Sequence, residues 1–200
     1  GVCKASQAPK GVPGGTGTGF AHFTNAQGST APTYPGRVED EGVVKTIKPE
    51  PAGGWFVGGA FDSVNGVKRH GLFRLQSNRT LDTSWSAPIA GYNPGVNAMA
   101  VIPDALGGAE VQIAGQFDTY VSGSWRYNCL RLKTATGTVQ TGFSPQPDNE
   151  VFAMVKQGNL WVIGGSFDHV GPYTLQSLAR FDDGGLADGG WKPTPNGDVR

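Results

Sequence analysis

Cysteine, charge and long apolar segments are all scarce in this 200-residue sequence, and each shortage excludes a class of protein. Two cysteines, Cys3 and Cys129, are too few for a zinc-binding cysteine quartet or a disulfide framework. Only 16% of the residues are charged, and 16 basic residues cancel 16 acidic ones, so no net field attracts a polyanion. No apolar run approaches the roughly 18 residues that a membrane-spanning helix needs. We therefore expect no binding to nucleic acid and no membrane insertion.

Glycine and proline, by contrast, are abundant. The chain contains 32 glycines and 14 prolines, which exclude a protein built from long helices. It also carries 10 Phe, 5 Tyr and 5 Trp, more aromatic area than disordered chains offer, so it is expected to fold. No segment shows a sustained helical period with caps, whereas short β-forming runs such as 96–102 and 151–155 are bounded by turn residues. The sequence predicts an all-β protein.

An internal repeat decides the predicted architecture. A strand-like segment that ends in a pair of small residues, one further residue and Phe occurs three times, and the phenylalanines Phe61, Phe117 and Phe167 are 56 and 50 residues apart. Each copy is followed by a short apolar segment with a central arginine and then by an aromatic residue. These arginines are Arg74, Arg131 and Arg180. Three short strands and a weaker fourth per repeat are typical of one β-propeller blade, which buries its faces against its neighbours.

The repeats predict an organisation of the chain into units. The segments are a Gly/Pro-rich N-terminal segment (1–18), the second half of a repeat (19–41), three repeats (42–92, 93–146 and 147–195) and the start of a further repeat (196–200). Three units and a half fall short of the four to eight blades of closed propellers. We therefore expect an incomplete propeller whose open strand edges are completed by more sequence or by another chain, and where partners bind.

Four short motifs of the first full unit carry a family resemblance. They are Gly58-Gly59-Ala60-Phe61, Asn65-Gly66, Arg74-Leu75 and Leu81-Asp82-Thr83-Ser84-Trp85. With them the unit resembles the delta-60 repeat, a kelch-like propeller blade found in tandem in large bacterial surface and extracellular proteins. The copy at 111–143 departs from the pattern, with Ala114 for the first Gly and Thr141 for the Asp. The resemblance implies a propeller-like β fold. We expect a location outside the cell, at a bacterial surface, in the secreted fraction or in a virion. The resemblance implies almost nothing about activity.

Residues that carry catalytic or metal chemistry form no recognisable constellation. Motifs such as His-Glu-x-x-His, Cys-x-x-Cys and Gly-x-Ser-x-Gly are absent. The repeated Asp62, Asp118 and Asp168 supply one carboxylate per turn, which is too few for calcium and is typical of a side chain that accepts the N–H groups of its own loop. The sequence therefore predicts no enzyme, no cofactor and no metal site.

The loop 118–127 holds the candidate contact residues Tyr120, Trp125 and Tyr127 among Ser and Gly, a mixture typical of contact surfaces. We interpret the chain as a non-enzymatic structural and interaction module of an extracellular assembly, either a bacterial surface protein or a virion or phage component. It would present loops and strand edges to protein partners, the same chain or others. The alternative is a carbohydrate-binding propeller module in which this aromatic loop binds a glycan.

The two cysteines are expected to differ. Cys129 stands at an apolar position of a repeated strand, where a free cysteine behaves as a small hydrophobic residue, so it is predicted to be buried and reduced. Cys3 lies in the Gly/Pro-rich terminal segment, where it could reach a neighbour. It is a candidate for an intersubunit disulfide in an oxidising setting.

Overall fold

The structure is a computed structural model that describes residues 42–103 and 108–200, and all regular elements in these ranges are β-strands. The strands are β1 (Val43–Glu50), β2 (Gly54–Ala60), β3 (Ser63–Val64), β4 (Val67–Lys68), β5 (Leu72–Gln76), β6 (Ala90–Pro103), β7 (Ala109–Val121), β8 (Ser124–Lys133), β9 (Val151–Gln157), β10 (Leu160–Gly165), β11 (His169–Val170), β12 (Tyr173–Thr174) and β13 (Leu178–Asp182). Among these residues no helix could cross a membrane. The all-β prediction is confirmed.

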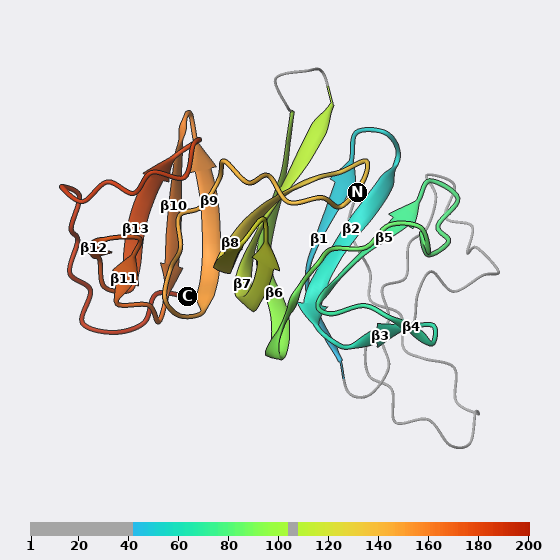
Figure 1. The fold of residues 1–200 in the computed structure, drawn as a ribbon, viewed down its shortest axis with the longest axis horizontal. Helices are drawn as coiled ribbons and strands as arrows, with labels where there is room; N and C mark the ends of the chain where they lie inside the picture. The colour runs from blue at the N-terminus through green and yellow to red at the C-terminus, as the bar shows by residue number, and fades with distance from the viewer. Residues whose placement is uncertain (1–41, 104–107) are drawn as a thin grey trace, which may run out of the picture.

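The strands form three antiparallel units that follow one another along the chain (Figure 1). Unit 1 contains β1, β2 and β5, unit 2 contains β6, β7 and β8, and unit 3 contains β9, β10 and β13. In each unit the second strand pairs with both others, which is the meander of a propeller blade. β6 begins three residues before the predicted repeat 93–146, and the pair Ala60 and Gly95 joins the sheets of units 1 and 2. The result is the predicted incomplete propeller-like fold.

The fourth strand of each unit is reduced to one bridge pair. The pairs are Leu75 with Leu81, Leu132 with Val139, and Phe181 with Ala187. The next residue donates its N–H to the carbonyl of the repeated arginine and the chain then turns away, because in units 1 and 3 this residue is an Asp whose carboxylate accepts two N–H groups of the turn. In unit 2 the structure puts Gln140, and not Thr141, at the position of this Asp.

The hydrophobic core consists of three clusters of buried side chains, one inside unit 1 and one at each junction between units. One cluster lies within unit 1, around Phe61 and Phe73. A second joins unit 1 to unit 2, with Phe56 and Trp85 against the apolar residues of β6 and β7. A third joins unit 2 to unit 3, and Cys129 packs there beside residues of β9 and β10. Each junction between units therefore buries apolar area, as packed blades require, and the predicted burial of Cys129 is confirmed.

The second small residue of each pair is a glycine that touches the backbone of the first strand of its own unit. A β carbon there would lie 2.0, 2.0 and 2.2 Å from a carbonyl oxygen in units 1, 2 and 3. The glycines and these oxygens are Gly59 and Val43, Gly115 and Gly95, and Gly165 and Glu150. The backbone of another strand packs so close to these glycines that a side chain has no room there.

Opposite this glycine the first strand of each unit carries one extra residue, a β-bulge. The bulge residues are Lys45, Asn97 and Phe152. The Lys45 ammonium donates to Asn97 Oδ1 at 2.6 Å, and Asn97 Nδ2 donates to the Val151 carbonyl at 2.7 Å and to Glu150 Oε1 at 2.9 Å. β1 lies against β6, and β6 lies against β9. The bulge residues thus connect the first strands of successive units.

Candidate functional site

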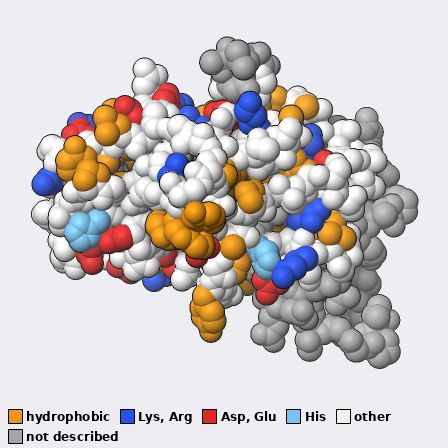
Figure 2. All heavy atoms as spheres, in the orientation of Figure 1, with side chains coloured by type: hydrophobic (Ala, Val, Ile, Leu, Met, Phe, Trp, Pro, Cys, Tyr) orange, Lys and Arg blue, Asp and Glu red, His pale blue; other side chains and the backbone are white. Residues whose placement is uncertain are grey.

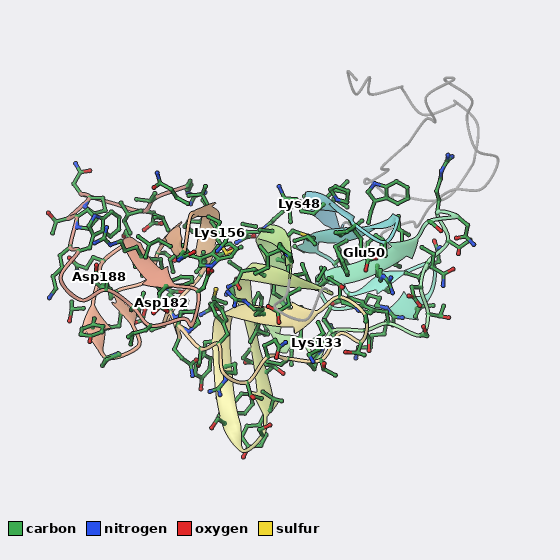
Figure 3. The ribbon with its side chains drawn as sticks, turned by 90° about the horizontal axis from the view of Figure 1, so that it is seen from above. Lys48, Glu50, Lys133, Lys156, Asp182 and Asp188 are labelled. Carbon is green, nitrogen blue, oxygen red and sulfur yellow. The ribbon has the colours of Figure 1, made fainter. Side chains whose placement is uncertain are left out.

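The β7–β8 hairpin is the feature that sets unit 2 apart. Its two-residue turn, Ser122-Gly123, has φ values of 51° and 80°, as a type I′ turn requires, and this turn follows the right-handed twist of two paired strands. The pairing of β7 and β8 continues from Asp118 with Tyr127 to Val121 with Ser124 at the tip. Figure 3 shows the hairpin extending away from the body of the molecule. Figure 1 looks along it, and hydrophobic side chains gather in the middle of that face (Figure 2).

Units 1 and 3 have short hairpins at the equivalent place, β3–β4 and β11–β12, and these form separate two-stranded sheets. Their inward residues Val64 and Val170 are fully buried in the core. From the repeated Phe to the first turn residue the chain advances four positions in units 1 and 3 but five in unit 2, where Phe117 precedes Ser122. One extra residue reverses the direction of the side chains that follow. The hairpin of unit 2 therefore does not bury an apolar side chain in the core as the hairpins of units 1 and 3 bury their valines.

Tyr120, Trp125 and Tyr127 lie together on the outer face of this hairpin. Tyr120 pairs directly with Trp125, and Tyr127 follows two residues later on the same face. The side chains are 61%, 49% and 41% exposed. The ring centroids of Tyr120 and Trp125 are 5.2 Å apart, and those of Trp125 and Tyr127 are 6.4 Å apart with ring planes 14° from parallel. We call these three residues the aromatic face.

The opposite face of the hairpin is turned toward the body. Thr119 is buried, and its partner Arg126 donates from its guanidinium to the carbonyl of Thr141 at 3.3 Å. Gln146 holds the open edge of β8, because its side-chain amide donates to the Trp125 carbonyl at 2.9 Å and accepts from the Tyr127 N–H at 3.1 Å. The base is fixed by Asn128, which accepts from the Phe117 N–H and donates to the Pro147 carbonyl. The aromatic face is therefore braced.

Asp118 belongs to the same site, and the sequence analysis assigned it only to a turn. It pairs with Tyr127, so its carboxylate lies on the side of the three rings. It also lies beside the backbone of Gly91, at the start of β6, where Tyr92 is 95% exposed. In the described part of the chain this carboxylate has no hydrogen bond and no ion pair. The spacing Asp-x-Tyr in a strand, with Trp-x-Tyr opposite, is the signal that could have found it.

The other repeated aspartates lie in separate units. Asp62 contacts His70 Nδ1 at 3.2 Å, and Asp168 accepts from the Gln176 amide at 3.5 Å. No group of three or more potential metal-ligating side chains occurs in residues 42–103 and 108–200. Cys3, the candidate for an intersubunit disulfide, lies outside the described residues.

A shallow depression of about 510 Å³ on unit 3 is lined by Leu160, Tyr173 and Leu186 together with two carboxylates. Asp182 accepts the N–H groups of its own turn, and Asp188 pairs with Arg180. Figure 3 shows both carboxylates on unit 3. Because both carboxylates are already engaged in the fold, the depression offers no unpaired carboxylate to a ligand.

Comparison with known proteins adds a family match over one stretch. Residues 53–84 match the family described as a domain of unknown function (DUF5122) beta-propeller. The stretch begins just before β2 and ends beyond β5, so it contains the glycine pair, the Asn65-Gly66 turn and Arg74 of unit 1. No curated protein and no solved structure matches the chain. The match indicates a propeller-type repeat, in agreement with the fold.

Proposed function

We propose that this chain is a non-enzymatic interaction module that binds a protein partner through the aromatic face of the β7–β8 hairpin. The observation that carries the proposal is a braced hairpin with three exposed rings, at a place where units 1 and 3 bury a valine. Tyr and Trp are the residues that dominate the binding energy of protein interfaces, because they bury a large area with few rotatable bonds. We further propose that the module belongs to an extracellular assembly, a bacterial surface protein or a virion component; the likeness to delta-60 repeats supports the bacterial surface.

The hydrogen bonds of the repeated arginines support a structural role rather than a catalytic one. Arg74 donates to Glu50 at 2.8 Å and to Asp82 at 3.1 Å, and so ties the first, third and fourth segments of unit 1. Arg131 donates from Nη1 to the Asp183 carbonyl at 2.8 Å and thereby joins unit 2 to unit 3. These guanidiniums are committed to strands and to junctions between units.

A carbohydrate-binding module is the second candidate, and one observation favours it. The rings of Trp125 and Tyr127 are 14° from parallel and both are exposed, an arrangement on which a sugar ring could stack. Glycan binding would need neighbouring polar groups, and Asp118 is one.

The proposal is tested by affinity capture with the purified chain from surface and secreted fractions of its source, followed by measurement of the binding of each captured protein in purified form. We expect Trp125→Ala to lower the affinity for a specific partner roughly tenfold or more, because truncation of an interface anchor has an effect of this size. Leu186→Ala removes an exposed apolar side chain on unit 3 and serves as the matched control. Unchanged partner affinity in the Trp125 variant would refute the proposal. A specific glycan on an array, lost in the same variant, would favour the second candidate.

A further inference from the structure

We infer that the protein partner places an arginine side chain on the aromatic face, where its guanidinium stacks on the rings and pairs with Asp118. This inference rests on the proposed function, since it specifies the chemistry of a partner at the same surface. Three features of the hairpin support the inference: its carboxylate has no cationic partner, its aromatic rings are exposed to solvent, and the edge of β8 is already hydrogen-bonded.

The charge of the site points to a cationic partner group. No cationic side chain of the described residues forms an ion pair with Asp118. The cation on the neighbouring strand, Arg126, lies on the opposite face and donates to a carbonyl. Aromatic ring faces are electron-rich and attract cations, and a carboxylate beside them adds direct charge pairing. A neutral apolar partner would bury Asp118 without compensation, which is costly.

Arginine fits this combination better than lysine. Its guanidinium is planar, stacks on rings and presents parallel donors to a carboxylate, whereas lysine offers a compact charge. The molecule already contains the same arrangement in unit 3. There Arg180 lies 5.3 Å from the centroid of the Trp191 ring and donates from Nε and Nη2 to Asp188 at 2.9 and 2.6 Å. On the hairpin the ring and carboxylate are present and the guanidinium is the missing member.

The edge of the hairpin argues against a partner that adds a β-strand there. Gln146 already uses the Trp125 carbonyl and the Tyr127 N–H, the groups that an incoming strand would need at this point of β8. A partner therefore meets the hairpin through side chains on its aromatic face.

The test is an NMR titration of the intact chain with acetylated, amidated Gly-Arg-Gly, Gly-Lys-Gly and Gly-Gln-Gly peptides and with a neutral N-acetylglucosamine trimer. The reporter is the Trp125 indole N–H, assigned by its loss in Trp125→Phe. We expect saturable shifts with the arginine peptide, weaker ones with lysine and none with glutamine. Asp118→Asn should weaken the arginine peptide by roughly tenfold, the usual effect of losing a charge-assisted bond.

The matched control is Asp62→Asn, which removes the carboxylate at the equivalent repeat position of unit 1 and should leave the titration unchanged. The inference would be overturned if the Asp118→Asn variant bound the arginine peptide as tightly as the wild-type chain. It would also be overturned if the glutamine peptide gave shifts as large as those of the arginine peptide. Saturation by the sugar alone would overturn it in favour of a glycan. If protein capture depends on Trp125 but not on Asp118, the proposed function stands and only the arginine is wrong.

Discussion

At the scale of single residues, the glycine that ends each pair of small residues lies against the backbone of a neighbouring strand. We expect Gly115→Ala to lower the free energy of unfolding by about 2 kcal/mol or more, because the new β carbon would lie 2.0 Å from the Gly95 carbonyl oxygen and β6 would have to move. Urea denaturation measures the change. Gly142→Ala is the control, since no atom lies within 4 Å of the added carbon. Equal stability of the two variants would contradict the packing described for this glycine.

Cys129 is the second residue whose surroundings dictate its behaviour. Burial raises the pKa of its thiol to about 12, against 9.0 for an exposed thiol, although a hydrogen bond from Gln112 and the charge of Arg131 oppose the shift. In the folded protein it should resist a disulfide reagent at pH 8, and it should react at once in denaturant.

The same shift makes stability depend on pH. The unfolded chain releases the thiol proton near pH 9 and the folded chain only near pH 12, so the stability contributed by the neutral thiol is present below pH 9 and is lost as pH rises toward 12. Cys129→Ala should lack this alkaline decline in denaturation experiments. A thiol that reacts in the folded state would show that the strand opens locally.

At the scale of elements, the brace on the β7–β8 hairpin should control its rigidity. Gln146→Asn keeps an amide and tolerates the positive φ of 59°, but its shorter side chain cannot reach both groups of β8. We expect hydrogen exchange at the Tyr127 N–H to become roughly tenfold faster, because this bond is lost. Hydrogen exchange in β10, which belongs to unit 3, should not change. Unaltered exchange at Tyr127 would mean that pairing with β7 alone holds the hairpin.

The elements also show how far sequence reasoning reaches. The repeated Phe, the glycine that ends each pair of small residues and the repeated arginine predicted the units, because their backbone or packing needs recur in all three. The bulge residues Lys45 and Asn97 could not be found, because their side chains share no chemistry and only the position repeats. The exposed rings were predicted as contacts, a role that stays a prediction. Asp118 was missed because the sequence analysis expected all three repeated aspartates to accept N–H groups of their own loops, whereas Asp62 and Asp168 contact side chains and strand pairing places Asp118 beside Tyr127.

At the scale of the whole molecule, Asp183 ties two units together. Its carboxylate accepts from Lys156 and from the Trp161 indole, and its carbonyl accepts from Arg131 of unit 2. Figure 3 shows Lys156 where unit 3 meets unit 2. Burial alone would raise the pKa of Asp183, but the bonds from Lys156 and Trp161 and the nearby positive charges outweigh it and lower the pKa.

We expect Asp183→Asn to lower the free energy of unfolding by about 0.5 to 1 kcal/mol at pH 7, a small change because the Asp183 side chain is 43% exposed and solvent screens the pair. Because the folded pKa lies below the ordinary value of 3.8, the wild-type advantage is present above that pH and is lost as pH falls through the lowered pKa. Denaturation at pH 7 and near pH 3, with Lys156→Met and the double variant completing a cycle, measures the coupling. A zero coupling energy would show that the pair contributes nothing to the junction.

The bulge residues carry a consequence for assembly order. Repeat proteins misassemble when one unit docks in the place of another, since their apolar faces are alike. Here the contacts of the bulge residues differ: Lys45 donates to Asn97, Asn97 donates to Glu150, and Arg200 lies 4.7 Å from the Phe152 ring. If unit 3 docked directly on unit 1, the Lys45 ammonium would lose the Asn97 amide oxygen that accepts its hydrogen bond. A unit docked out of order would therefore lose the hydrogen bonds that the bulge residues make with the proper neighbour.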